Sequence, residues 1–207
     1  MNKANSPYVV GITGTISSGK SAVGKILEAQ QIPVLDSDQI VHYLLSEDTS
    51  TRKAVLERFG DSIANPETGS VDRIALGKIV FTDEKARRDL EAIVHPAVIL
   101  ECRKRVQENG SGSIVAILAP LLFEAGLKSE YNEIWTVITN IEILRERLRQ
   151  RDKLTDSEVE RRLAAQWTQE KKASLSDAVI DNSGSLEETA KQVDALLSKI
   201  KAKIQAN

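Results

Sequence analysis

The chain has 207 residues, 41% of them apolar, which is enough for one well-packed domain with modest insertions. Its 28 basic and 30 acidic side chains give a net charge of −2, which argues against nucleic-acid or anionic-membrane binding by bulk electrostatics. With one cysteine, no apolar run near the roughly 20 residues of a membrane span and no signal-peptide pattern, we expect a cytoplasmic protein with no obligate protein partner.

Five short apolar runs, most of them rich in Val and Ile, are predicted to be buried strands. None alternates cleanly with polar residues, which is typical of parallel strands covered on both faces. The predicted strands are residues 8–12, 32–35, 114–118 and 134–138, with a weaker run at 178–180.

Helical patterns fill the intervals between these strands. They cover residues 20–30, then 38–46, 51–59, 73–80 and 83–107, then 141–151 and 157–174, and finally 185–204. The alternation predicts a doubly wound α/β fold with a five-stranded, mostly parallel sheet and helices on both faces. The second interval is too long for one crossover helix, so we interpret it as a helical insertion that binds a second substrate.

Residues 14–21 match the phosphate-loop pattern G-x-x-x-x-G-K-S without a mismatch. Gly14 and Gly19 permit backbone angles and close approaches that a side chain would block, so the N–H groups of the loop can point at phosphate oxygens. Lys20 supplies a positive charge for the β- and γ-phosphates, and Ser21 offers a hydroxyl to Mg²⁺. An apolar strand precedes the loop and a helical pattern follows it, which argues against a chance Gly- and Ser-rich turn.

We therefore predict that ATP, with Mg²⁺, binds along this loop and the start of the following helix. The predicted loop contacts are Gly14, Thr15, Ile16, Ser17, Ser18, Gly19, Lys20, Ser21 and Ala22.

A phosphate loop alone does not decide where the γ-phosphate goes. The sequence has no N-K-x-D motif, which would indicate a GTPase. The strand 114–118 ends in Ala119-Pro120, without the carboxylate that motor and transporter ATPases usually carry there. We therefore predict a small-molecule kinase whose acceptor-activating or metal-binding carboxylate lies elsewhere.

Asp36 and Asp38 follow the second predicted strand and supply that carboxylate. Parallel strands end on the side where ligands bind, so both are expected near the γ-phosphate. Asp38 is the predicted proton acceptor, and Asp36 is predicted to reach the metal. Either could instead cap the next helix. His42 lies four residues after Asp38 on the same helical face and is predicted to contact substrate or Asp38, or else is an ordinary surface or core histidine.

With these motifs in place, the sequence resembles the dephospho-CoA kinase family over residues 9–182. The family typically has Asp-Ala-Asp where this chain has Asp-Ser-Asp, and further glycines where this chain has Thr15 and Ser17; Ala22 stands where the family often has Thr. The resemblance is carried by residues 11–21, 34–38, Arg73, Leu76, Phe81, His95-Pro96, 120–124, Arg147, Arg151-Asp152, Gln166 and 179–182.

The resemblance implies transfer of the ATP γ-phosphate to the ribose 3′-hydroxyl of dephospho-CoA, the last step of coenzyme A synthesis, with Mg²⁺. It implies that Asp38 is the general base. It also implies a nucleotide-binding core of residues 8–38, 108–140 and 175–207, a substrate-binding insertion of residues 39–107, and lid helices within residues 141–174.

Four further residues are candidates for ligand contact. Arg147 and Arg151 share a helix face and are predicted to clamp ATP phosphates, although Arg145 and Arg149 also make a plain solvated face possible. Pro96 is expected to break the helix at His95, which is then a substrate-binding candidate or a buried structural histidine. Arg73 is predicted to meet acceptor phosphates, unless it is a surface residue.

Two other functions remain open on the sequence. One is a kinase for another small acceptor, such as a nucleoside or a nucleoside monophosphate. The other is a nucleotide-binding regulatory protein without turnover, against which the intact set of Lys20, Ser21 and Asp38 argues.

Overall fold

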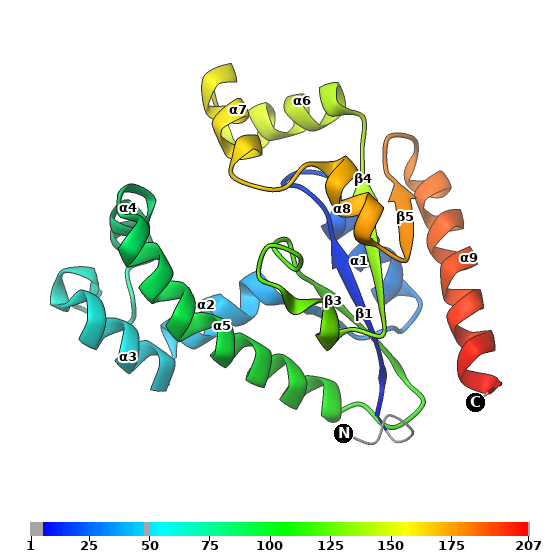
Figure 1. The fold of residues 1–207 in the computed structure, drawn as a ribbon, viewed down its shortest axis with the longest axis horizontal. Coiled ribbons are helices and arrows are strands. Elements are labelled where there is room, and N and C mark those ends of the chain that lie inside the picture. Colours follow the sequence, from blue (N-terminus) through cyan, green and yellow to red (C-terminus); the bar gives the residue numbers. More distant parts are fainter. Residues whose placement is uncertain (1–5, 48–49, 207) are drawn as a thin grey trace. The chain divides into compact units, whose positions relative to one another are not determined.

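The computed structural model describes residues 6–47 and 50–206, which form two compact units (Figure 1). The first unit is made by the chain up to Leu35 and again from Asn109 onward. The second unit is the segment Asp36–Glu108. Each unit has its own hydrophobic core.

A five-stranded sheet forms the centre of the first unit. Its strands are β1 (Tyr8–Thr13), β2 (Val34–Asp36), β3 (Ile114–Leu118), β4 (Glu133–Ile138) and β5 (Ala178–Asp181). Their order in the sheet is β2-β3-β1-β4-β5. The pairs β1–β3, β1–β4 and β4–β5 are all parallel, with Val10 beside both Ala116 and Glu133. The five strands and the α/β class predicted from the sequence are confirmed.

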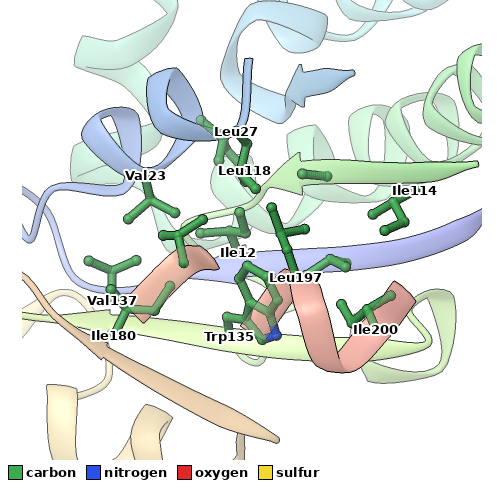
Figure 2. Packing of buried hydrophobic residues seen from close by; sticks show 13 residues of the cluster. Ile12, Val23, Leu27, Ile114, Leu118, Trp135, Val137, Ile180, Leu197 and Ile200 are labelled. Atoms are coloured by element: carbon green, nitrogen blue, oxygen red, sulfur yellow. The ribbon is translucent and has the colours of Figure 1, made fainter. Parts of the chain in front are cut away.

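Helices α1 (Lys20–Ala29) and α9 (Leu186–Gln205) contribute to the main core beneath the sheet. Figure 2 shows Leu197 and Ile200 of α9 near Trp135, and Val23 and Leu27 of α1 in the same cluster beyond Ile12 and Leu118. Trp135 is fully buried, and its indole N–H donates to Glu133 Oε1 at 2.8 Å. Burying these large apolar side chains supplies most of the stabilisation of the fold.

The other face of β4 packs against a second cluster. Ile134, the neighbour of Trp135, lies with Leu122 and Phe123 instead of in the main core, because successive side chains of a strand point to opposite faces. Trp167 packs against this cluster, and helix α8 (Gln169–Leu175) contacts β4. Both faces of the sheet are therefore covered, as the unbroken apolar character of its strands predicts.

Two helices lie between β4 and α8, namely α6 (Ile141–Asp152) and α7 (Asp156–Ala164). The prediction of one helical segment over residues 157–174 is wrong, because the chain leaves the helical path between α7 and α8. There, Trp167 N–H donates to Glu124, and Thr168 caps α8 by accepting from Lys171 N–H. Tertiary partners thus take hydrogen bonds that a continuous helix would have used.

The second unit is helical. It contains α2 (Ser37–Ser46), α3 (Ser50–Phe59), α4 (Arg73–Thr82), α5 (Glu84–Gln107) and a short 3₁₀ turn at Asp61–Ile63. Its core gathers side chains from all of these segments, with Leu45, Val55, Ile63, Leu76 and Val94 buried. Helix α5 packs against α2, α3 and α4, which makes it the central element of the unit.

Helix α5 runs unbroken through Pro96, so the predicted break at His95 is wrong. Proline removes one backbone donor and crowds the carbonyl four residues earlier, which belongs to Ala92. Both Ala92 and Pro96 are exposed, so this disruption faces solvent, while Val94 and Val106 on the buried side keep their packing. Over residues 6–47 and 50–206, no helix has the length and apolar character needed to cross a membrane.

Two leucines of helix α9, one buried in the main core and one exposed, provide a test of this packing. Leu197→Ala should lower the free energy of unfolding by about 2–5 kcal/mol, because Leu197 is buried in the cluster around Trp135. Leu186→Ala, at the exposed start of the same helix, should change it by less than about 0.5 kcal/mol. Denaturant unfolding followed by tryptophan fluorescence measures both, and equal effects would contradict this assignment of the core.

Candidate active site

The turn between β1 and α1, residues 14–19, places two glycines where a side chain does not fit. Gly19 has φ +105°, and a Cβ there would lie 1.8 Å from Asn182 Nδ2. A Cβ on Gly14 would lie 2.4 Å from the Val137 carbonyl oxygen. These clashes explain both glycines of the motif by close approach of the neighbouring strand ends.

Lys20 folds back over this turn. Its Nζ donates to the carbonyl oxygens of Gly14 and Thr15, each at 2.9 Å. Helix α1 begins at Lys20 without a side-chain N-cap, and its first turn carries no acidic residue. The positive end of the helix and the ammonium group therefore act at the same place, which favours an anion.

Three hydroxyl groups in the turn are buried and have no hydrogen-bond partner in the described part of the chain. They belong to Thr15, Ser17 and Ser18. Ser17 also has φ +62°, a left-handed conformation that costs a non-glycine residue about 1 kcal/mol. Buried donors without partners and local strain are expected where a ligand completes the hydrogen bonding. The turn thus fits a phosphate group.

Two residues that the sequence analysis did not assign to the site hold the turn in place. Gln166 Oε1 accepts from Ile16 N–H at 2.9 Å. Asn182 Nδ2 donates to the Ser18 carbonyl at 2.9 Å, and Asn182 Oδ1 accepts from Thr189 Oγ1. Asn182 directly follows β5, so the end of that strand is joined to the turn.

The two predicted arginine contacts differ in their surroundings. Arg147 is half-buried and donates to the Asn182 carbonyl at 3.3 Å. Because Asn182 also binds Ser18, Arg147 is linked to the turn through Asn182. Arg151 is exposed and pairs with Asp152, which also binds Arg162. Arg145 and Arg149 likewise pair with carboxylates of α6 and α7. Of the two predicted arginines, only Arg147 joins the network around the turn.

A buried ion pair lies beyond the end of β3 and was also missed. The Lys172 side chain is fully buried, and its Nζ donates to Glu124 Oε1 at 2.8 Å and to the Pro120 carbonyl at 2.6 Å. Burial lowers the pKa of Lys172, whereas the hydrogen bond and charge of Glu124 act to raise it. Thr13 at the end of β1 donates to the same Pro120 carbonyl. This pair therefore connects the ends of β1 and β3 with helix α8.

The predicted carboxylates lie at the start of the second unit. Asp36 is the N-cap of α2, and its Oδ1 accepts from the N–H groups of Asp38 and Gln39. The capping interpretation of Asp36 is thus confirmed, while its metal role stays a prediction. Asp38 lies in the first turn of α2 and is exposed, with His42 one turn further along.

Two predicted acceptor contacts meet within the second unit. Arg73 Nη1 lies 3.4 Å from His42 Nδ1, so α2 and α4 bring these side chains together at an exposed position. His95 is half-buried in the middle of α5, and its contact with substrate stays a prediction. Among residues 6–47 and 50–206, no three His, Cys, Asp or Glu side chains gather as a metal site.

Comparison with known proteins decides the family. The profile described as dephospho-CoA kinase matches residues 8–188. The chain belongs to the dephospho-CoA kinase family. The kinase is 42% identical over 188 residues to the dephospho-CoA kinase of Synechococcus sp. strain CC9902, covering 91% of this chain and 94% of that one. It is 41% identical over 193 residues to that of Geobacter sulfurreducens, covering 92% and 98%.

Solved structures agree with this family. The Thermus thermophilus protein TT1252 superposes on the kinase with a TM-score of 0.80 at 31% identity, covering 94% of this chain and 98% of that one. The dephospho-CoA kinase of Campylobacter jejuni gives a TM-score of 0.69 at 25% identity, with the same coverage. Shikimate kinase from Aquifex aeolicus, at 18% identity and a TM-score of 0.51, shares the fold alone, covering 92% and 96%. The predicted family is thereby confirmed.

The sequence held a signal for some of the missed residues. Gln166, Asn182 and Glu124 all belong to the segments that carry the family resemblance, but no pattern in the sequence gives their partners. Lys172 had no signal, because it follows Lys171 in a polar helix. Only the tertiary structure separates the two: Lys171 lies over the Trp167 ring at 3.4 Å, and Lys172 is buried.

The close approach of Asn182 to Gly19 predicts that a side chain at position 19 weakens nucleotide binding by the kinase. Gly19→Ala should weaken ATP binding by about tenfold or more, because the new methyl group displaces Asn182 and strains the turn. Gly110→Ala is the matched control, since a Cβ there meets nothing within 4 Å. Isothermal titration with ATP measures both, and normal affinity in Gly19→Ala would contradict the described packing of the turn.

Proposed function

We propose that this chain transfers the γ-phosphate of ATP to the ribose 3′-hydroxyl of dephospho-CoA. The observation that carries the proposal is a complete phosphate-binding turn in a chain whose residues 8–188 match the dephospho-CoA kinase family. The inference of nucleotide binding rests on the fully matching motif of residues 14–21, and the inference of the acceptor rests on the family.

The phosphate turn binds ATP in this proposal. Its N–H groups and the start of α1 receive the phosphates, and the Lys20 ammonium, which the carbonyls of Gly14 and Thr15 hold over the turn, balances charge on the β- and γ-phosphates. Arg147 is the better supported of the two lid arginines, since its guanidinium lies against the Asn182 carbonyl beside the turn. Arg151 reaches phosphate only by giving up Asp152.

Asp38 accepts the proton of the acceptor hydroxyl and orients it for attack. Its exposed position in the first turn of α2 supports this role, since an activating carboxylate must reach the substrate. His42, Arg73 and His95 bind the acceptor in this proposal. The His42–Arg73 pair is the best supported of them, because a guanidinium beside an imidazole suits the diphosphate of dephospho-CoA.

Mg²⁺ bound with ATP would neutralise charge on the phosphates, held by the Ser21 hydroxyl and the phosphate oxygens. Ser21 fits this role because it is exposed in the first turn of α1, directly after Lys20. Asp36 is the proposed additional ligand. Its Oδ1 is occupied by the cap of α2, so only Oδ2 is available to a metal.

The division of labour within the chain is part of the proposal. The helical unit Asp36–Glu108, close to the predicted insertion of residues 39–107, binds the acceptor. Helices α6 and α7 close over the nucleotide as a lid and exclude water. All but the last residue of helix α8 falls in the predicted lid of residues 141–174, but its contacts with β4 and Glu124 favour a moving part made of α6 and α7 alone.

The acceptor is tested by incubating the purified protein with ATP and a panel of candidate acceptors, and analysing the products by mass spectrometry. We expect consumption of ATP with dephospho-CoA and a product heavier by one phosphoryl group at the 3′ position. Phosphorylation of nucleosides or nucleoside monophosphates without reaction of dephospho-CoA would establish the rival kinase. ATP binding with no transfer to any acceptor would establish a regulatory protein.

Asp38→Asn separates binding from chemistry. The variant should bind ATP normally but lose about 10²- to 10⁴-fold in turnover, because an amide cannot take the acceptor proton. Glu67→Gln, an exposed carboxylate change in the same unit, is the control and should leave turnover unchanged. Near-normal turnover of Asp38→Asn would exclude Asp38 as the base.

Asp36→Asn distinguishes a cap from a metal ligand. Asparagine caps helices as well as aspartate does, so the variant should keep the stability of α2. If Asp36 also binds the metal, the variant should need a higher Mg²⁺ concentration for half-maximal activity. Asp36→Ala removes the cap as well and should cost about 1 kcal/mol of stability. An unchanged Mg²⁺ dependence in Asp36→Asn would restrict Asp36 to capping.

A further inference from the structure

The segment from the end of α7 to the first residue of α8, residues 165–169, is bound to the segments that follow three strands, and we term it the strap. Gln166 binds the turn after β1, Trp167 N–H donates to Glu124 beyond β3, and Gln169 binds Thr139 after β4. The Gln169 carboxamide accepts from Thr139 N–H and donates to the Thr139 carbonyl, both at 2.8 Å. The strap therefore joins the base of the α6–α7 pair to the phosphate turn.

One peptide group of the turn is hydrogen-bonded to both Gln166 and Lys20. The carbonyl of Thr15 accepts from Lys20 Nζ at 2.9 Å, and the N–H of the same peptide, on Ile16, donates to Gln166 Oε1 at 2.9 Å. No described peptide bond is cis, so this planar group points its oxygen and its hydrogen in opposite directions. Rotation of the plane that breaks one hydrogen bond disturbs the other.

Gln166 is itself held firmly enough to orient this peptide. Its neighbour Trp167 donates its backbone N–H to Glu124 Oε1 at 3.0 Å, and the Trp167 ring stacks on Phe123 with centroids 6.5 Å apart. Glu124 is fixed in turn by the fully buried Lys172. Buried hydrogen-bonded charges resist displacement because separating them leaves an unpaired charge in a poorly hydrated interior.

We propose that Gln166 is a positioning residue for phosphoryl transfer, acting through the Thr15–Ile16 peptide on the ammonium group of Lys20. The inference deepens the proposed function and rests on it, since it takes Lys20 as the cation at the ATP phosphates. Because the strap begins where α7 ends, movement of α6 and α7 is transmitted by Gln166 to the loop that grips the nucleotide.

A double-mutant cycle tests this coupling. Gln166→Met keeps the length of the side chain and removes the acceptor for Ile16 N–H. It should weaken MgATP binding about tenfold, the equivalent of one lost hydrogen bond. In the Lys20→Ala background the same change should alter the dissociation constant by less than about twofold, because its target is already absent. Calorimetric titration with MgATP measures all four proteins.

Equal losses in the two backgrounds would overturn the proposal, since a merely structural role gives additive effects. Gln150→Met on helix α6 is the control, because Gln150 is exposed and its carboxamide donates to Glu146 in the same helix. It should leave MgATP affinity unchanged. Gln166→Ala serves as a second variant if Gln166→Met does not fold, and its cycle must show the same non-additivity.

Amide hydrogen exchange gives an independent readout without any ligand. The Ile16 N–H should be protected in the unmodified protein and lose that protection in Gln166→Met, while Gln166→Glu, which keeps an acceptor oxygen, should restore it. Rapid exchange at Ile16 in the unmodified protein would refute the proposal. These binding and exchange measurements do not need dephospho-CoA, so they stay readable if the proposed acceptor is wrong.

Discussion

The constraint on which the first unit depends is that the backbone turn of residues 14–19 must hold its shape while its buried hydroxyls stay available to phosphate. Within the turn, Ser18 N–H donates to the Thr15 carbonyl at 3.2 Å, and two residues from outside, one after β5 and one after α7, hold the turn as well. Asn182 beyond β5 binds its Ser18 carbonyl and Gln166 binds its Ile16 N–H. The parallel sheet makes this possible, because it brings the carboxyl ends of its strands to one edge.

The buried Glu124–Lys172 pair supports the turn indirectly, because it binds Trp167, the neighbour of Gln166. Such pairs are weak contributors to stability, because desolvating two charges offsets most of their attraction. Their value lies in geometry: Lys172 binds Glu124 and the Pro120 carbonyl, while Glu124 also accepts from Trp167 N–H. One charged pair thereby fixes the loop after β3 and the strap together. An apolar pair could fill the space but could not direct these hydrogen bonds.

Helices α6 and α7, the proposed lid, show how charge pairing distinguishes arginines of the same chemistry. Arg145, Arg149 and Arg151 all have carboxylate partners on α6 or α7, so a phosphate must compete with those partners. Arg147 donates instead to a backbone carbonyl beside the turn, a weaker partner that a phosphate group displaces more readily. In the second unit, by contrast, the predicted acceptor residues His42 and Arg73 remain exposed and in contact with each other.

The sequence by itself determined the α/β class, the five strands, the phosphate loop and the family, because apolar runs and the glycine–lysine spacing are local patterns. Only the tertiary structure decided that α5 continues through Pro96, that residues 157–174 form two helices, and that Asp36 caps α2. It alone placed Gln166 on Ile16 and buried Lys172 while exposing Lys171. These outcomes depend on which groups distant segments bring within hydrogen-bond reach, and a local pattern does not encode that.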